Sequence, residues 1–357
     1  MNFETTDTSY IAKQTPDTVN ILVTGGAGYI GSHTVVALVE AGFNPVIVDD
    51  FSNSELRVLE GLEKILGFKP RYFAENCNDA AVIRRIIEEE SIGGAIHFAA
   101  FKAVGESMQE PLKYYRNNLG SLLALVQTML ECGVSNLIFS SSATVYGQPD
   151  ELPVREDAPL PPSMSVYGNT KQIGEEILRD TATAKKALKA ISLRYFNPIG
   201  AHPSSQIGEL PRGVPNNLVP FITQTAAGLR PALTVFGNDY DTPDGTCLRD
   251  FIHIMDLAEA HVEALKYLIK STDSTFYDVF NVGTGHGNSV LGIIRTFEEV
   301  SGVLLKYKIG ERRPGDAAAV YADAGKIYRR LGWQARRTMR EGLADAWRWQ
   351  QRLGLRD

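Results

Sequence analysis

Cysteine is scarce in this chain, and the three that occur are Cys77, Cys132 and Cys247. Their number is odd, they lie far apart and no CxxC pair is present, so the sequence supports neither a disulfide framework nor a structural zinc site. The six histidines show no pairing at the spacing of metal ligands. We therefore expect a reducing, cytoplasmic compartment and no bound metal.

Long apolar runs and an excess of positive charge are also missing. No segment reaches the length that spans a membrane, and residues 1–19 lack the basic start and apolar stretch of a signal peptide. These 19 residues are polar and threonine-rich, and we expect a flexible or loosely docked extension. The formal net charge of -6 gives no general reason to expect nucleic acid or an anionic membrane as a partner.

The 357 residues, 44% hydrophobic and 22% charged, suffice for one large domain or two closely packed ones. Short apolar strands alternate with helical patterns up to about residue 195, which predicts a doubly wound, Rossmann-type parallel sheet with helices on both faces. Residues 198–250 are rich in proline, glycine and asparagine. We expect a dinucleotide-binding domain over 20–195 and a smaller mixed α/β domain over 196–357, which could return a strand to the first.

The glycines of TGGAGYIG, namely Gly25, Gly28 and Gly31, stand between the first strand and the first helix. In such a turn the first glycine allows the bend, the second lets the backbone approach a pyrophosphate, and the third lets helix and strand pack closely. Asp49 and Asp50 end the second strand, where a carboxylate accepts hydrogen bonds from ribose hydroxyls and repels a 2′-phosphate. NAD is therefore favoured over NADP. Alternatively, both aspartates only start a surface turn.

Tyr167 and Lys171 lie four residues apart in a helical pattern, so their side chains share one face. A free tyrosine has a pKa of about 10, and a nearby ammonium group favours its phenolate form. The strand end FSSSATVYG supplies hydroxyl groups, such as those of Ser140 and Ser142, that could hold a substrate oxygen. Alone, a Tyr-x-x-x-Lys pair is common by chance. Downstream of the glycine turn, it indicates proton transfer at a substrate hydroxyl.

Together these features resemble the extended branch of the short-chain dehydrogenase/reductase superfamily. Eight segments are similar to those of the UDP-glucose 4-epimerases within it: VTGGAGYIGSHT, HFAAFKAVGES, FSSSATVYG, YGNTK, RYFNPIGAH, VPNNLVPFI, VFGNDYDTPDGTCLRDFIHIMDLAEAH and FNVGTGHGNSVL. The resemblance covers residues 20 to about 350. It implies a cytoplasmic, NAD-dependent isomerase, expected as a homodimer. Such an enzyme oxidises a UDP-sugar transiently at C4, lets the 4-keto sugar rotate and reduces it from the other face.

The resemblance also assigns roles to residues of the cofactor side. Ser142 would be the catalytic hydroxyl, Tyr167 the base, and Lys171 the group that tunes Tyr167 and binds the nicotinamide ribose. Further cofactor contacts are expected from Tyr29, Ile30, Asn76, Cys77, Phe98, Ala99, Ala100, Lys102, Asn117, Ser140 and Tyr195. Asn76 departs from the family pattern, which usually has aspartate there. Its amide oxygen can still accept a hydrogen bond from the adenine amino group.

On the substrate side, the resemblance implies a UDP-sugar pocket that draws on widely separated segments. Asn216–Leu218 would open a helix against the diphosphate, Phe236 would flank the uracil, and Asp316 would take the uridine ribose. Planar guanidinium groups suit phosphates, although an arginine taken alone would more simply be a solvated surface charge. The residues expected to hold the substrate are Lys102, Ser142, Phe196, Asn197, Asn216, Asn217, Leu218, Phe236, Arg249, Arg313, Asp316 and Val320.

Val320 bears on the substrate range, because it lies where the family has a gatekeeper beside the sugar 2-position. A small residue there implies activity on UDP-N-acetylglucosamine and UDP-N-acetylgalactosamine beside the unmodified pair. Alternatively, Val320 only packs against its neighbours. A 4,6-dehydratase typically needs an acidic pair after the catalytic hydroxyl, and Ala143 and Thr144 stand there instead. A decarboxylase of the same branch and a non-catalytic NAD-sensing protein stay as further alternatives.

Overall fold

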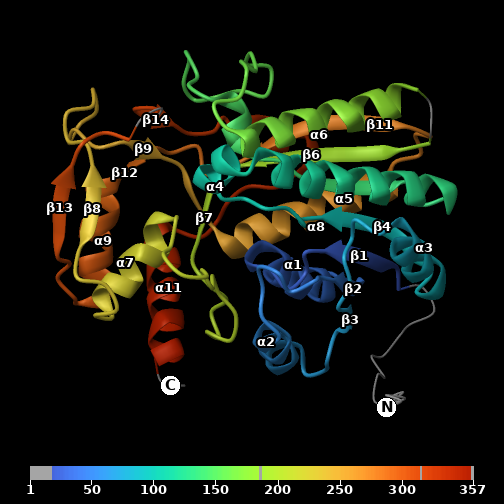
Figure 1. Ribbon diagram of the computed structural model, residues 1–357, viewed down its shortest axis with the longest axis horizontal. Coiled ribbons are helices and arrows are strands. Elements are labelled where there is room, and N and C mark those ends of the chain that lie inside the picture. Colours follow the sequence, from blue (N-terminus) through green and yellow to red (C-terminus); the bar gives the residue numbers. More distant parts are fainter. Residues whose placement is uncertain (1–17, 185–186, 314–315, 355–357) are drawn as a thin grey trace.

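The computed structural model describes residues 18–184, 187–313 and 316–354, and it has a central sheet with helices on both faces and a smaller lobe at one end (Figure 1). Residues 1–17 of the expected N-terminal extension lie outside the described residues. Within the described part of the chain, no helix is long and apolar enough to cross a membrane.

A seven-stranded sheet is the centre of the fold, and every neighbouring pair of its strands is parallel. In spatial order the strands are β11 (Phe276–Val282), β6 (Lys189–Tyr195), β5 (Asn136–Ser140), β4 (Ile92–His97), β1 (Asn20–Thr24), β2 (Asn44–Val48) and β3 (Arg71–Phe73). The order reverses between β1 and β4, and ligands of such sheets bind at the carboxyl ends beside the reversal. The predicted Rossmann-type fold class is confirmed.

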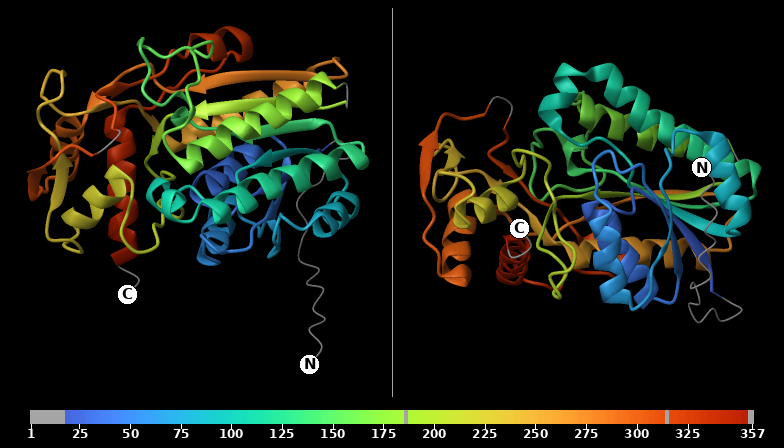
Figure 2. Two further views of the ribbon diagram at one scale, coloured as in Figure 1. Left: turned by 45° about the horizontal axis from the view of Figure 1, so that its top comes forward. Right: turned by 60° about the horizontal axis from the view of Figure 1, so that its bottom comes forward.

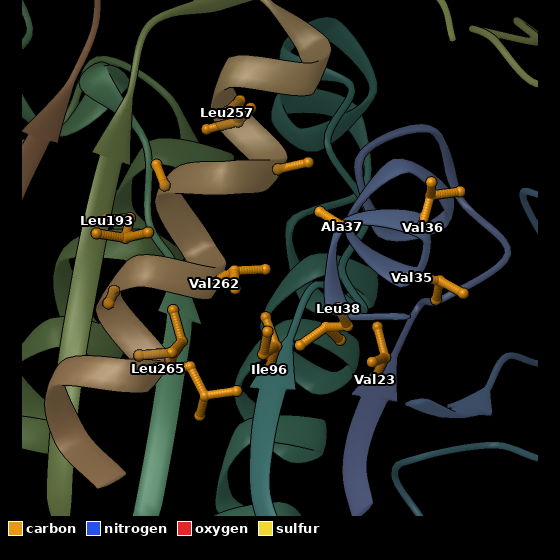
Figure 3. Close-up of a cluster of buried hydrophobic side chains, with 14 of the residues drawn as sticks. Val23, Val35, Val36, Ala37, Leu38, Ile96, Leu193, Leu257, Val262 and Leu265 are labelled. Atoms are coloured by element: carbon orange, nitrogen blue, oxygen red, sulfur yellow. The ribbon is translucent and has the colours of Figure 1, made fainter. Parts of the chain in front are cut away.

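Helices cover both faces of the sheet because successive strand residues point to opposite sides. Val23 and Ile96 face α1 and α8, where they meet Leu38 and Val262 (Figure 3), whereas Leu22 belongs to the core on the other side. The first core also includes residues of α2, and the second draws on α3, α5 and α6. The bounds are α1 (Tyr29–Glu40), α2 (Arg57–Leu66), α3 (Ala80–Glu89), α5 (Pro111–Glu131), α6 (Val166–Thr183) and α8 (Ile254–Lys270).

Two elements of the C-terminal half belong to the large domain: β11 is a strand of its sheet, and α8 is one of the helices that cover it. β11 pairs with β6 along its whole length, from Phe276 beside Lys189 to Val282 beside Tyr195. α8 packs against α1 and contributes buried residues to the same core (Figure 3). A strand from the second predicted domain thus lies in the sheet of the first, while the boundary near residue 195 stays a prediction.

The smaller lobe lies beyond the carboxyl ends of the strands, since the arrowheads of β6 and β11 point toward it in the left view of Figure 2. It contains short strands and the helices α7, α9 and α11, packed around a core of its own. The remaining elements of the described chain are α4 (Val104–Gln109), a 3₁₀ turn (Ala143–Tyr146), β7 (Asn197–Ile199), α7 (Leu218–Ala226), β8 (Leu233–Phe236), β9 (Leu248–Arg249), β10 (Phe251–His253), β12 (Asn288–Ser289), α9 (Val290–Ser301), β13 (Tyr307–Gly310), β14 (Ala319–Val320), α10 (Gly325–Leu331) and α11 (Met339–Gly354).

Candidate active site

The glycine turn has the close packing that its spacing predicts. Gly25 has a φ of +70°, and a Cβ there would lie 2.8 Å from the backbone nitrogen of Ala99. A Cβ on Gly31 would lie 2.2 Å from the carbonyl oxygen of Gly25, so helix and turn can approach only without it. Gly28 caps α1, and around a Cβ placed there the described residues offer a single near atom, the Gly25 oxygen at 3.1 Å. That side of the turn has room for a ligand phosphate.

Asp49 is buried at the carboxyl end of β2 and ties this strand to the glycine turn. Its carboxylate accepts hydrogen bonds from the backbone nitrogens of Ala27 and Phe51, each at 3.0 Å, and from the Ser54 hydroxyl at 2.8 Å. Burial raises the pKa of Asp49, and these three hydrogen bonds oppose the rise. Asp49 therefore has a structural part beside its expected contact with a ribose. Asp50 is exposed and accepts from the backbone nitrogen of Ser52 at 2.9 Å.

Ser142, Tyr167 and Lys171 lie together at the carboxyl end of β5, with side chains that are 7%, 8% and 4% exposed. Ser142 opens the 3₁₀ turn, and its hydroxyl oxygen accepts from the nitrogen and the hydroxyl of Thr144 at 3.2 Å and 2.9 Å. Ser165 caps α6, which carries Tyr167 and Lys171 on one face. The Lys171 Nζ atom lies 5.8 Å from the centroid of the Tyr167 ring.

Burial has the largest effect on the pKa values of Tyr167 and Lys171. It raises the pKa of Tyr167 to about 12, although the hydrogen bond with the Ser142 side chain opposes the rise. It lowers the pKa of Lys171 to about 7, and the negative charge of Glu175 opposes this fall. Lys171 donates from Nζ to the Ser140 carbonyl oxygen at 2.6 Å. In the protein alone, Tyr167 is thus protonated at neutral pH, and a positive charge placed beside it would favour the phenolate.

The other residues expected around the cofactor line the same edge of the sheet. The hydroxyls of Tyr195 and Ser140 lie 2.6 Å apart at the ends of β6 and β5. Phe98, Ala99 and Ala100 follow β4 directly, next to the glycine turn. Their positions fit the expected cofactor wall, and their contacts with NAD stay predictions.

Asparagine side chains connect the expected adenine region with α5. The Oδ1 atom of Asn76 accepts from the nitrogen and the Nδ2 atom of Asn78 at 2.9 Å and 3.1 Å. Nδ2 of Asn78 also donates to Oδ1 of Asn117 at 3.3 Å. The amide oxygen expected to meet adenine therefore already accepts two hydrogen bonds. Cys77 is buried beside it, and burial raises the pKa of its thiol to about 12, so the thiol is neutral.

The first residues of α7 lie close to a carboxylate that also reaches the cofactor side. Asn217 caps α7, which begins at Leu218, and its Nδ2 atom donates to Oε1 of Glu209 at 2.7 Å. The same oxygen lies 3.4 Å from Nζ of Lys102. Glu209 therefore links two residues that the resemblance assigns to the cofactor and to the substrate diphosphate.

Short strands bring together substrate residues that are far apart in the sequence. β14 pairs with β9 so that Val320 lies beside Arg249, and Arg249 forms an ion pair with Asp316. The guanidinium carbon of Arg313 lies 4.0 Å from the centroid of the Phe236 ring. Four of the expected substrate residues thus form two pairs on the small lobe, Arg249 with Asp316 and Arg313 with Phe236.

Phe196 and Asn197 follow β6 and lead from the large sheet into the small lobe. Both the backbone nitrogen and Nδ2 of Asn197 donate to the Asp250 carbonyl oxygen at 3.0 Å. Phe196 is buried in a small apolar cluster against which Ala143 and Val320 pack. Because Ala143 follows Ser142 in the chain, this cluster places Val320 close to the strand end that carries Ser142.

Four of the histidines are buried in the interior of the protein. Burial lowers the pKa of His33 and His97 to about 3 and that of His253 and His261 to about 4, so all four are neutral. Over the described ranges, no group of three or more His, Cys, Asp or Glu residues could hold a metal ion.

Comparison with known proteins agrees with this geometry. A family model described as GDP-mannose 4,6 dehydratase matches residues 22–346. The UDP-glucose 4-epimerase of Bacillus subtilis is 49% identical over 330 residues, which cover 92% of this chain and 96% of that relative. The chain belongs to the UDP-glucose 4-epimerase family.

Solved structures of this family superpose closely on the chain. The UDP-glucose 4-epimerase of Stenotrophomonas maltophila, crystallised with NAD and formylated UDP-arabinopyranose, gives a TM-score of 0.92 at 45% identity and covers 95% of this chain and 100% of its own. The UDP-Glc/GlcNAc 4-epimerase of Campylobacter jejuni gives 0.80 at 38% identity and covers 94% and 99%. The dehydratase description of the matched model finds no support in the site, because Ala143 and Thr144 follow Ser142 where water elimination needs acidic groups.

Several residues that the structure places around the site were not predicted from the sequence. Glu175 and Arg194 form a buried ion pair behind the group of Ser142, Tyr167 and Lys171, called the catalytic group below for its expected role. Arg212 donates to the carbonyl oxygens of Phe51 at 3.0 Å and Ser54 at 2.7 Å, and so joins the segment before α7 to the loop after β2. One signal was available: Glu175 lies one helical turn after Lys171, and Arg194 directly precedes Tyr195.

Proposed function

We propose that this chain is an NAD-dependent epimerase that interconverts UDP-glucose and UDP-galactose at C4 of the sugar. The observation that carries the proposal is the buried group of Ser142, Tyr167 and Lys171 at the carboxyl end of β5. It lies at the same edge of the sheet as the glycine turn after β1. Relatives at close to half identity over nearly the whole chain bear the epimerase name, which supports the same activity.

The residues of the glycine turn fit a dinucleotide. The turn leaves room for phosphate at Gly28, the N-terminus of α1 faces that space, and the carboxylate of Asp49 is fixed next to it. NAD held by these residues would accept the electron pair removed from C4, and its oxidised form would bring a positive charge to the site. The carboxylate of Asp49 would repel a 2′-phosphate, which favours NAD over NADP.

The side chains of the catalytic group can carry the proton through both halves of the reaction. Ser142 donates a hydrogen bond to the 4-oxygen and holds it against Tyr167. Tyr167 takes the hydroxyl proton while C4 is oxidised and returns it when the 4-keto sugar is reduced from the other face. Lys171, in its ammonium form, lowers the pKa of Tyr167. Because the oxidation is reversed within each cycle, the sugar undergoes no net change of oxidation state.

The UDP portion would be held mainly by the small lobe. Arg249 and Arg313 supply permanent positive charge for the two phosphates, and the free N–H groups at the start of α7 add donors. Asp316 holds the Arg249 guanidinium in place and is expected to reach the uridine ribose. The sugar is then left free to rotate between Tyr167 and the wall that contains Val320.

The proposal includes the N-acetylated sugars. Val320 is partly buried against the cluster of Phe196 and Ala143, next to the catalytic strand end. A valine occupies far less volume than a tyrosine, so the 2-acetamido group has space while the 4-keto sugar turns. A structural relative that bears the name UDP-Glc/GlcNAc 4-epimerase is consistent with this range. A cytoplasmic homodimer, implied by the resemblance alone, completes the proposal, and light scattering after gel filtration tests its mass.

The test is an incubation of the purified protein with UDP-galactose and, separately, with UDP-N-acetylgalactosamine. We expect UDP-glucose and UDP-N-acetylglucosamine as products without added cofactor, and NAD in the nucleotide extracted from the protein. Tyr167→Phe, prepared identically, is the control for a contaminating epimerase. A wild-type protein without activity on UDP-galactose contradicts the proposed function, and NADP in the extract contradicts the role of Asp49.

A further inference from the structure

A buried ion pair lies directly behind the catalytic group. The side chains of Glu175 and Arg194 are 6% and 5% exposed. Nε of Arg194 lies 2.9 Å from Oε1 of Glu175, and Nη2 lies 2.6 Å from Oε2, so the contact is bidentate. Taking two charges out of water costs several kcal/mol for each ion, so such a pair needs good geometry and further hydrogen bonds to persist.

The carboxylate of Glu175 connects the two segments that carry the catalytic residues. Glu175 lies one turn after Lys171 on α6, the helix that also carries Tyr167. Its Oε1 atom accepts a hydrogen bond from the hydroxyl of Ser141, the residue before Ser142. Glu175 is therefore a direct link between the strand end with the catalytic hydroxyl and the helix with the base.

Arg194 extends the link to two further segments. It directly precedes Tyr195 on β6, and its Nη1 atom donates to the Tyr146 hydroxyl at 3.0 Å and to the Glu156 carbonyl oxygen at 3.1 Å. Tyr146 ends the 3₁₀ turn after Ser142, and its hydroxyl donates to Oδ1 of Asn281 at 2.6 Å. The guanidinium thus has partners on and after the turn, and Tyr146 connects it further to β11, which keeps the pair satisfied although it is buried.

We propose that Glu175 is a positioning residue for the epimerisation: through Ser141 it fixes the hydroxyl of Ser142 against Tyr167, and through its charge it maintains the ammonium form of Lys171. The proposal rests on the proposed function. The backbone between Ser141 and Ser142 transmits the first effect, because it sets the position of the Ser142 Cα atom from which the catalytic hydroxyl projects. The second effect acts over the single helical turn between Glu175 and Lys171.

The charge of Lys171 depends on few neighbours. Burial lowers its pKa to about 7, and Glu175 is the carboxylate that opposes this fall. The hydroxyls of Tyr167 and Tyr195 are protonated at neutral pH because burial raises their pKa. Lys171 faces Tyr167 and Glu175 on α6 and His97 on β4. The titratable or charged groups around Glu175 and Tyr167 include Arg194 and Tyr195 on β6, Tyr277 on β11 and Tyr146 of the 3₁₀ turn.

Removal of the Glu175 charge would act on Lys171 in one direction. His97 is neutral, with a pKa lowered to about 3 by burial, so it supplies no charge. Without the carboxylate, the charge that opposes the effect of burial on Lys171 is gone. The pKa of Lys171 then falls further, and the activity that needs its ammonium form is lost at a lower pH than in the wild type.

The experiment is a comparison of Glu175→Gln with the wild-type holoenzyme on UDP-galactose over a neutral to alkaline pH series. We expect kcat to fall by about 10- to 100-fold, as for a small misplacement of reacting groups, with KM and bound NAD within about twofold. The alkaline limb of the kcat profile should move to lower pH. In Glu175→Asp, which keeps the charge, the limb should stay where the wild type has it.

A matched control separates positioning from loss of stability. Asp256 is a fully buried carboxylate on α8 that pairs with Arg337 and accepts from the backbone nitrogens of Arg336 and Arg337 at 3.0 Å and 2.8 Å. Asp256→Asn should lower the unfolding midpoint as Glu175→Gln does, yet leave kcat and the alkaline limb unchanged. Equal losses of kcat in both variants would overturn the proposal.

A second variant decides the matter if Glu175→Gln does not fold. Ser141→Ala keeps the ion pair and removes the hydroxyl that connects it to the strand end. We expect kcat to fall by about 10-fold, because a hydrogen bond to a carboxylate is lost, with an unmoved alkaline limb. A wild-type kcat in this variant, or in a folded Glu175→Gln, overturns the positioning role. A wild type inactive on UDP-galactose instead contradicts the proposed function.

Discussion

The site has a catalytic half, which is Ser142, Tyr167 and Lys171 with the ion pair behind them, and a substrate half on the small lobe. The two halves differ in how deeply their charged side chains are buried. Behind the catalytic group, Glu175 and Arg194 are 6% and 5% exposed, whereas the Arg249–Asp316 pair of the small lobe is 19% and 30% exposed. Charges interact strongly in the first environment and are screened by water in the second. We infer that the catalytic half fixes the protonation states and positions of the reacting side chains. The substrate half supplies affinity for UDP, and its side chains can shift without loss of catalysis.

The two halves also differ in the length of the helices and strands that carry their residues. Tyr167 and Lys171 lie on the eighteen-residue helix α6, which packs against the large sheet. Arg249 and Val320 lie on two-residue strands that pair with each other. Proton transfer needs groups held within a few tenths of an ångström, which long packed elements provide. Recognition of a flexible diphosphate is commonly carried by loops on a rigid scaffold.

The largest effect is expected from the catalytic half, in Tyr167→Phe. This change removes the proton acceptor while leaving the ring in place, so kcat should fall by about 10²- to 10⁴-fold, the usual contribution of a general base. KM for UDP-galactose and the bound NAD should stay close to the wild-type values. Steady-state kinetics and nucleotide extraction check both. A kcat within a few-fold of the wild type would remove Tyr167 from the role of base.

In the substrate half, Arg249→Met is expected to act on binding. Loss of a charged hydrogen bond to phosphate costs about 1.5–3 kcal/mol, so KM should rise by roughly 10- to 150-fold with little change in kcat. Arg312→Met is the matched control, because Arg312 pairs with Asp239 at the surface and stacks 4.2 Å from the Tyr240 ring centroid. Its KM should be that of the wild type. An Arg249→Met variant that loses kcat rather than affinity would contradict the division between the halves.

A smaller and more selective effect is expected from Val320→Tyr. The larger ring narrows the wall beside the sugar, so activity on UDP-N-acetylgalactosamine should be lost while activity on UDP-galactose is mostly kept. Parallel assays with the two substrates measure the ratio of the activity on UDP-N-acetylgalactosamine to that on UDP-galactose. Val320→Leu, which adds one methylene group without an aromatic ring, is the conservative control. Equal loss on both substrates would mean that Val320 supports the fold and does not select the substrate.

The smallest effect is expected outside both halves, at the exposed pair of Arg84 and Glu131. Water and salt screen such surface pairs, so Arg84→Met should leave kcat, KM and the unfolding midpoint unchanged within error. Thermal unfolding and kinetics of the same preparation give all three values. A loss of activity here as large as in Glu175→Gln would show that burial does not separate the two kinds of ion pair.

Local patterns in the sequence predicted much of the fold and part of the site. The alternation of strands and helices indicated the parallel sheet, and the glycine spacing indicated a closely packed turn. In the structure, a Cβ on Gly31 would meet the Gly25 carbonyl oxygen. The four-residue spacing of Tyr167 and Lys171 was enough to place both on one face of α6. These features depend on residues that are close in the chain, where periodicity and backbone geometry decide the outcome.

The rest depends on pairings between distant segments. Nothing local to Glu175 shows that its partner is Arg194, because the contact requires α6 to lie on the sheet beside β6. The meeting of Arg249 and Asp316, 67 residues apart, follows from the pairing of β9 with β14. Resemblance to a family placed Arg249 and Asp316 in one substrate pocket without predicting a contact between them, and it assigned no role to Glu175 or Arg194. Arg212, which joins two loops through backbone carbonyls, carries no sequence signal of its own.

The central claim is that the sugar is oxidised and reduced again at C4 within one catalytic cycle, with Tyr167 moving the proton. The most direct measurement follows UDP-galactose that carries deuterium at C4 through conversion by the purified protein in ordinary water. The account predicts that the UDP-glucose formed keeps the deuterium at C4, because the hydrogen leaves and returns without meeting solvent. Loss of the deuterium to water would show that C4 is deprotonated instead, and it would contradict the account.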